Sequence, residues 1–219
     1  MDNRQVKDIL YEQVARICKA LASPKRLEIL EILAQGSKAV ESVAQEVGIS
    51  IKLASAHLKA LKEARLVTGQ RNGKQIFYSI SGGDVAQLGV MVRDVAQEHL
   101  LELQLALQQI MASPDDLTQF GRKDLIARAK RGEVIILDVR PSEEFETAHL
   151  PFARSMPLNE LSKRISELSA DVEIVAYCRG PFCLMSDEAV RILRKKGRKA
   201  SKTTDGVTEW LYAGQHIAE

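Results

Sequence analysis

A short apolar run, residues 174–177, ends on Cys178 and leads through a Gly-Pro turn into a helical pattern over residues 185–195. This order predicts a strand, a tight loop and a helix N-terminus, a unit found in α/β folds. Backbone N–H groups in such a loop and the positive end of the helix dipole favour an anion. Arg179 adds a full positive charge beside the cysteine. Because all three effects stabilise a thiolate, the sequence predicts that Cys178 is a reactive nucleophile rather than a buried structural residue.

A second apolar run, residues 134–140, is typical of a strand buried in a parallel sheet. Strand and helix patterns alternate around it, so this half of the chain is predicted to be an α/β domain with a parallel sheet. Functional side chains in such sheets lie at the carboxyl ends of strands. The predicted catalytic residues are Cys178, Arg179, Cys183, Asp138 and Arg140. For Cys183, a bridge to Cys178 and a simple packing role both remain open.

The N-terminal half shows a different pattern, in which short helices are followed by two β-type runs. A first helix carries apolar residues at helical spacing, namely Val6, Ile9, Leu10, Val14, Ile17 and Leu21. Helices over residues 40–47 and 51–64 are separated by Gly48 and capped at Ser50, which predicts a helix-turn-helix. In the second of these helices the residues expected to face inward are Leu53, Ala54, Leu58 and Leu61. The β-type runs over residues 66–70 and 75–80 flank an Asn-Gly turn, the strongest short hairpin signal, so the whole pattern predicts a winged helix.

Positive charge is concentrated on this candidate recognition region. The chain has a formal net charge of only +2, but residues 50–80 hold six basic residues and one acidic residue. Cations gathered on one stretch are what phosphate contacts need, although a solvated helix face is the alternative. Ser55, His57 and Lys59 are candidates for reading base edges in the major groove. Lys52, Arg71 and Lys74 are expected to contact phosphate.

A long helical pattern over residues 84–111 carries two apolar stripes, more than one small domain can cover. The first is Val85, Leu88, Val92 and Val95, and the second is Leu100, Leu103, Leu107 and Ile110. We therefore expect a partner chain, and a two-fold dimer would want a pseudo-palindromic operator in double-stranded DNA. Charged residues within the pattern, such as Arg93 and Glu98, argue against a membrane span.

The region from residue 17 to residue 80 resembles the ArsR/SmtB-type bacterial repressors, most clearly over residues 21–30, LASPKRLEIL. The resemblance implies a homodimeric winged helix whose first and last helices form the dimer interface. Many members of that family sense metals, but residues 40–45 contain no Cys or His where the family's cysteine-rich motif would lie. His99 stands alone as a candidate ligand in the last helix, whereas zinc needs three or four ligands. We therefore expect no metal site, and a packing role for Cys18.

The C-terminal half resembles a rhodanese domain over residues 117–214. The matching pieces are residues 137–140 with 143–145, 149–151 with Ala153, 177–179, and 205–210. The resemblance implies a sulfane sulfur carried as a persulfide on Cys178. Ala148 and Phe152 stand where the family usually has glycine, and Cys183 stands where the loop usually ends in arginine. Leu184 replaces the arginine that related phosphatases need, so phosphatase activity is not expected.

Together these patterns predict a winged helix-turn-helix domain (residues 1–112), a linker (113–119) and a rhodanese-like α/β domain (120–219). We expect a DNA-binding repressor that responds to a sulfane-sulfur donor, such as polysulfide or thiosulfate, through Cys178. The alternative is a sulfurtransferase whose winged helix serves dimerisation or localisation, and a third is a binding module without turnover. No cofactor, metal or membrane partner is expected. Three cysteines and no signal-peptide pattern at the N-terminus suit a reducing cytoplasm.

Overall fold

The computed structural model describes residues 2–110 and 116–218, and the chain divides into two compact units, Met1–Gly89 and Val90–Glu219. In the described part of the chain, no helix is both long and apolar enough to cross a membrane. The predicted linker, residues 113–119, falls partly outside the described residues. Beyond that gap, Leu117 and Thr118 already pair with Lys202 at the edge of a sheet.

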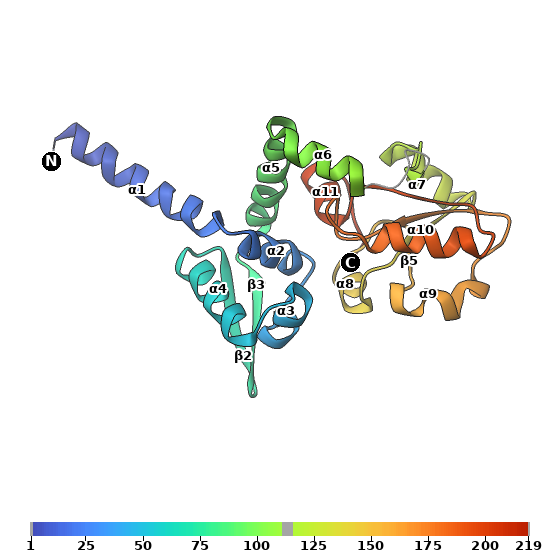
Figure 1. Ribbon diagram of the computed structural model, residues 1–219, viewed down its shortest axis with the longest axis horizontal. Helices are drawn as coiled ribbons and strands as arrows, with labels where there is room; N and C mark the ends of the chain where they lie inside the picture. Colours follow the sequence, from blue (N-terminus) through green and yellow to red (C-terminus); the bar gives the residue numbers. More distant parts are fainter. Residues whose placement is uncertain (1, 111–115, 219) are drawn as a thin grey trace. The chain divides into compact units, whose positions relative to one another are not determined.

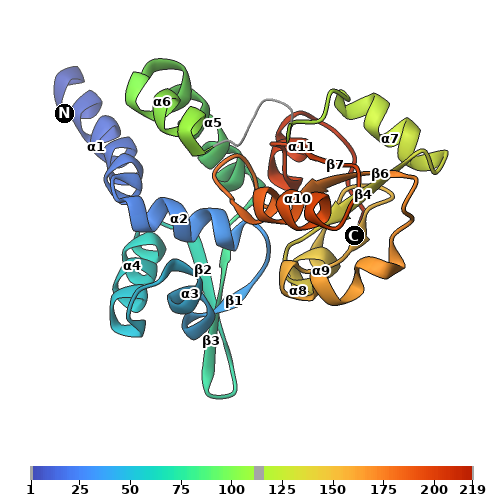
Figure 2. The same ribbon diagram turned by 45° about the vertical axis from the view of Figure 1, so that its right-hand side comes forward.

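The first unit is a winged helix, as the sequence predicts. Its elements are α1 (Asn3–Leu21), α2 (Pro24–Leu33), β1 (Lys38–Ala39), α3 (Val40–Val47), α4 (Ile51–Glu63), β2 (Val67–Asn72) and β3 (Gln75–Ile80). The three strands form an antiparallel sheet in the order β1-β3-β2. The β2–β3 hairpin projects beyond the helices of this unit (Figure 2). The short strand β1 was not predicted, because two residues carry no periodic signal.

The turn between α3 and α4 follows the expected local chemistry. Gly48 adopts a left-handed φ of 66°, which ends α3, and the Ser50 hydroxyl accepts a hydrogen bond from Leu53 N at 3.3 Å, which starts α4. The prediction that Leu53 faces inward is wrong, since this residue is 44% exposed. The buried stripe of α4 follows positions 54, 58 and 61, spaced by four and three residues, and position 53 lies one helical step off it.

Helix α1 leaves its apolar stripe uncovered within the chain. It extends away from the other helices of its unit (Figure 1), and Ala20 is its one buried residue. Val6, Ile9, Leu10 and Val14 are all at least 40% exposed. The resemblance to the ArsR/SmtB-type repressors implies that this first helix contributes to a dimer interface.

The single helix predicted over residues 84–111 is instead two helices, α5 (Gly83–His99) and α6 (Leu101–Ile110). The side-chain amide of Gln104 donates to the carbonyl oxygens of Gln97 and Glu98, at 2.9 and 3.1 Å. In a continuous helix the N–H groups of residues 101 and 102 would hold those carbonyls. The break at Leu100 therefore has a side-chain cap that apolar periodicity does not reveal. Met111, the predicted end of the helix, lies outside the described residues.

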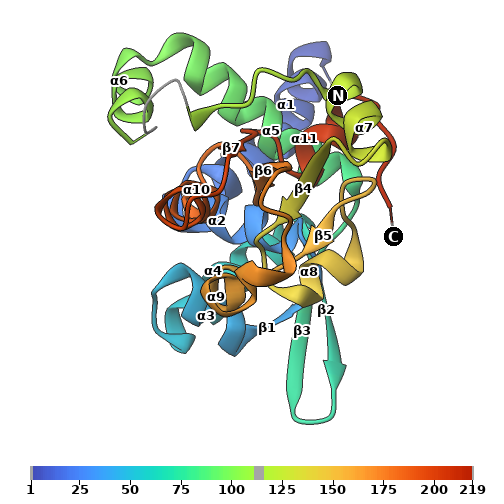
Figure 3. The same cartoon turned by 90° about the vertical axis from the view of Figure 1, so that its right-hand side faces the viewer.

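The second unit contains a four-stranded parallel sheet, which confirms the α/β prediction. After the end of α5 and α6 come α7 (Arg122–Lys130), β4 (Val134–Asp138), α8 (Ser142–Thr147), β5 (Arg154–Ser155), α9 (Leu158–Arg164), a 3₁₀ turn (Ile165–Glu167), β6 (Glu173–Tyr177), α10 (Met185–Lys195), β7 (Ala200–Lys202) and α11 (Val207–Tyr212). The strand order is β5-β4-β6-β7 (Figure 3).

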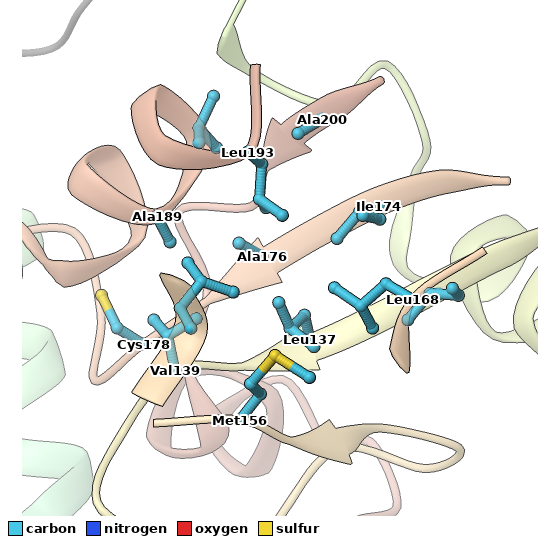
Figure 4. Packing of buried hydrophobic residues seen from close by; sticks show 13 residues of the cluster. Leu137, Val139, Met156, Leu168, Ile174, Ala176, Cys178, Ala189, Leu193 and Ala200 are labelled. Carbon is cyan, nitrogen blue, oxygen red and sulfur yellow. The ribbon is translucent and has the colours of Figure 1, made fainter. Parts of the chain in front are cut away.

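The sheet is buried on both faces, and alternate residues of each central strand serve one face each. On one face, Leu137, Ile174 and Ala176 pack against α9 and α10 (Figure 4). On the other face, Val175 and Tyr177 pack with residues of α7 and α11. Strand β6 thus ends between two cores, and Cys178 follows directly at its carboxyl end.

Candidate functional site

The Cys178 sulfur lies between the end of β6 and the start of α10. It is 3.2 Å from the backbone oxygen of Cys183 and 3.3 Å from the hydroxyl oxygen of Ser186. In Figure 4 this sulfur lies at the edge of the apolar cluster, away from Leu137 and Ile174. As a thiol, Cys178 donates to the carbonyl; as a thiolate, it accepts a hydrogen bond from the Ser186 hydroxyl.

The loop lowers the pKa of the Cys178 thiol. Burial by itself would raise this pKa, but hydrogen bonds from the Cys183 thiol, the Ser186 hydroxyl and the backbone N–H groups of Ser186 and Gly180 outweigh it and bring the value to about 7. The predicted cradle of loop amides is therefore present. A group with a pKa of about 7 is substantially ionised at neutral pH, and the ionised form is the nucleophile.

Cys183 has the opposite character. Its thiol donates a hydrogen bond to Cys178, and this contact together with burial raises the pKa of the Cys183 thiol. The two cysteines therefore divide into an anionic partner and a proton-bearing partner. The structure brings their side chains into contact, as flanking one tight loop led us to expect.

Access to the thiol differs from the expectation of a sulfur at the mouth of the loop, because Cys178 is only 2% exposed. The neighbouring apolar residues Phe182 and Leu184 are 43% and 53% exposed. A reagent must be small, or the loop must move, to reach the sulfur.

The other predicted catalytic residues form ion pairs of their own. Arg179 makes two hydrogen bonds to Glu144 of α8, at 3.0 and 2.5 Å. Arg140 is buried on Asp138 at 2.6 Å and also donates to the Ala148 oxygen at 2.8 Å. These hydrogen bonds and ion pairs connect the chain segments that surround the carboxyl edge of the sheet. The hydrogen bonds to the Cys178 sulfur come instead from Cys183, Ser186 and the loop amides.

Sequence reasoning missed Ser186, Glu209 and Arg93 as residues of this region. Ser186 stands in the first turn of α10, where a hydroxyl facing the loop could have been expected. Glu209 lies at the start of α11 and accepts a hydrogen bond from Gly206 N at 2.8 Å. Arg93, in the part of α5 that belongs to the second unit, forms an ion pair with Glu209. No sequence signal joins positions 93 and 209.

The residues predicted to contact DNA lie on the surface of the first unit. Lys52, Ser55 and Lys59 are exposed on α4, and His57 is half-buried. Arg71 and Lys74 are exposed at the tip of the β2–β3 hairpin. Lys59 has only a loose contact of 3.9 Å with Glu63, both side chains being well exposed, so this ion pair restrains the Lys59 side chain only weakly.

Metal ligands do not gather in the described residues: no group of three or more His, Cys, Asp or Glu side chains is placed to hold an ion there.

Comparison with known proteins divides the chain in the same way. Residues 23–68 match the family model described as bacterial regulatory protein, arsR family. Residues 122–213 match the model described as rhodanese-like domain.

One relative matches over nearly the full length. HTH-type transcriptional regulator Rv0324 of Mycobacterium tuberculosis is 45% identical over 213 residues, which is 97% of this chain and 93% of the relative. The putative sulfur carrier protein YrkF of Bacillus subtilis is 38% identical over 76 residues, 35% of this chain and 40% of that protein. Among solved structures, a homodimeric winged helix-turn-helix DNA-binding domain from Mycobacterium bovis has 47% identity and a TM-score of 0.43. It covers 47% of this chain and 93% of that one.

Proposed function

Because the chain belongs to the ArsR family of HTH-type transcriptional regulators and carries a C-terminal rhodanese-like domain, we propose that it regulates transcription in response to reactive sulfur. The observation that carries this proposal is the Cys178 thiol, whose pKa of about 7 makes it a nucleophile at neutral pH. A reactive thiol in the same chain as a DNA-binding domain allows a reaction with sulfur to change DNA binding, which is what a sensor requires. The name of the YrkF relative supports sulfur chemistry in this half.

The first step is capture of a sulfane sulfur. The Cys178 thiolate attacks the outer sulfur of thiosulfate, an S–S bond forms, and the S–S bond of thiosulfate breaks so that sulfite leaves with its electron pair. With polysulfide, a shorter polysulfide leaves instead. Cys178 then carries a persulfide anion, and the loop amides of Gly180 and Ser186 stabilise the negative charge.

Cys183 provides a second step. The Cys183 proton passes to the outer sulfur of the persulfide, the resulting Cys183 thiolate attacks the inner sulfur, a Cys178–Cys183 disulfide forms, and hydrosulfide leaves with that proton. The two cysteines are oxidised and the sulfane sulfur is reduced, so no further oxidant is needed. The hydrogen bond between the two thiol groups supports this role, and the raised pKa of the Cys183 thiol means that its proton has to be transferred within this step.

DNA binding belongs to the first unit in this proposal. Helix α4 enters the major groove of a pseudo-palindromic operator, with Ser55, His57 and Lys59 toward the bases. Lys52 and the hairpin residues Arg71 and Lys74 contact phosphate. Two copies of the chain bind the two half-sites. Charging of Cys178 lowers operator affinity and releases repression.

A DNA-binding titration tests the proposal. An operator is first selected from random-sequence duplexes with the reduced protein, and affinity is then measured with and without inorganic polysulfide. We expect wild type to lose affinity about tenfold or more, and Cys178→Ser to keep it. In Cys183→Ser, mass spectrometry should find persulfide but no internal disulfide. Equal loss of affinity in Cys178→Ser rejects Cys178 as the sensor. Steady thiosulfate:cyanide turnover without a selectable operator would favour the sulfurtransferase alternative.

A further inference from the structure

Helix α5 is joined to α11, beside the Cys178 loop, through a buried ion pair, and we propose that Arg93 is a positioning residue that makes the loop receptive to anionic sulfur. This inference rests on the proposed function and adds how the loop and α5 influence each other. Both partners of the pair, Arg93 and Glu209, lie in the unit Val90–Glu219. Their side chains are 10% and 8% exposed.

Arg93 contacts the loop region in two ways. Its guanidinium group forms the ion pair with the Glu209 carboxylate. The same group lies over the ring of Phe182, with its central carbon 5.6 Å from the ring centroid. Phe182 is the loop residue that precedes Cys183, so one arginine side chain spans the loop and the start of α11.

Glu209 is held against the loop backbone. One of its oxygens accepts a hydrogen bond from Gly206 N at 2.8 Å. A side chain at Gly206 would come within 2.6 Å of the carbonyl oxygens of Cys178 and Arg179, so only glycine fits there. Gly180 has a φ of 152°, and a Cβ at this position would lie 3.0 Å from the Glu209 carboxylate. The carboxylate therefore abuts the residues that surround the reactive sulfur.

A carboxylate in this place opposes the chemistry of the loop. Two anions at close range in a buried site repel each other, and the loop has to hold a thiolate and then a persulfide anion. Arg93 cancels that repulsion. Two other charged side chains around the loop are engaged in ion pairs: Arg179 with Glu144 of α8, and Asp187 of α10 with Lys202 of β7. Glu188, in the first turn of α10, is exposed to solvent. The neighbouring Cys183 thiol keeps its proton and donates a hydrogen bond to Cys178.

Helix α5 begins at Gly83, within the first unit, and continues to Arg93 in the second. A new negative charge on Cys178 changes the field in which the Arg93–Glu209 pair sits, and it thereby changes how strongly α5 is held. By linkage, whatever shifts α5 also changes how readily the loop accepts an anion. Helix α5 is thus the covalently continuous element between the Arg93–Glu209 pair and the DNA-binding unit.

The first experiment measures the loop without DNA. Alkylation of Cys178 by iodoacetamide is followed across pH by mass spectrometry in the full-length protein. Arg93→Ala leaves the Glu209 carboxylate without its cationic partner. The midpoint of the alkylation rate against pH should therefore rise, and the alkylation rate at pH 7 should fall roughly fivefold. In Arg93→Lys and in the double variant Arg93→Ala/Glu209→Gln, the alkylation rate at pH 7 should lie within about twofold of the wild-type rate. The control is Lys195→Ala, at an exposed position of α10.

The double variant lacks the same arginine as Arg93→Ala but also lacks the Glu209 charge. If its alkylation rate recovers, the slow rate of Arg93→Ala is due to the unpaired charge and not to loss of folding. Profiles of Arg93→Ala and wild type that superimpose would overturn the proposal, and so would a double variant as slow as Arg93→Ala. The second experiment measures operator affinity after saturating polysulfide treatment. The response should be retained in wild type and Lys195→Ala but reduced in Arg93→Ala. A wild type that does not respond contradicts the proposed function, whereas equal responses of wild type and Arg93→Ala contradict only the inference.

Discussion

At the scale of single residues, the reactivity of Cys178 depends on a balance between burial, which raises the pKa of its thiol, and hydrogen bonds, which lower it to about 7. We predict that alkylation of Cys178 follows a profile with its midpoint near that value. Ser186→Ala removes one hydrogen bond to the thiolate, so the midpoint should rise by about one pH unit and the rate at pH 7 should fall about fivefold. Peptide-resolved mass spectrometry measures both quantities.

The exposed Ser169→Ala is the matched control for this substitution. An unchanged midpoint in Ser186→Ala would contradict the assigned hydrogen bond. Because the Cys178 pKa is lowered, the thiolate is the form that is lost as pH falls through about 7. Sulfur capture should therefore weaken below that pH and approach its full rate above it.

Much of this site could be predicted from the sequence, because the strand, the thiol and the helix N-terminus are contiguous over residues 174–195. The contacts of Arg179 could not, since Glu144 lies 35 positions away. The pairing of Arg93 with Glu209 joins positions 116 apart and follows no periodic pattern. Phe152 is another case: its φ of 63° is a left-handed conformation, which fits the glycine that the rhodanese resemblance places there.

At the scale of elements, helix α4 and the β2–β3 hairpin carry separate tasks. Lys52→Ala and Lys74→Ala each remove a predicted phosphate contact, so binding should weaken for all duplexes and the slope of log affinity against log salt should fall by about 1. His57→Ala should instead change the preferred sequence. Filter binding over a salt series measures the slopes, and selection from random duplexes measures preference.

Lys123→Ala, at an exposed position of α7, serves as the charge-matched control. Slopes that stay at the wild-type value in Lys52→Ala and Lys74→Ala would remove these residues from the interface.

The boundaries of helices and strands show what apolar periodicity in the sequence cannot predict. The hairpin was predicted because Asn72-Gly73 marks its turn, whereas the division between α5 and α6 depends on the side-chain amide of Gln104.

At the scale of the whole molecule, the exposed stripe of α1 calls for a second copy of the chain. Leu10 and Val14 are 61% and 59% exposed. We predict that Leu10→Glu and Val14→Glu weaken self-association by roughly a hundredfold, because burying an unpaired carboxylate costs several kcal/mol. Sedimentation equilibrium measures the effect. Leu211→Glu, on the exposed side of α11, is the matched control. If both α1 variants self-associate as strongly as wild type, the dimer interface does not include this stripe of α1.

The near-complete enclosure of Cys178 has a consequence for timing. A covering that slows the arrival of a reagent also slows the departure of what has been bound, since both pass the same barrier. An oxidised Cys178, carrying either a persulfide or a disulfide bond to Cys183, is shielded from bulky cellular thiols that would reduce it. The regulator would then keep a record of a sulfur pulse after the pulse has ended, and its memory would last until the enclosed Cys178 is reduced.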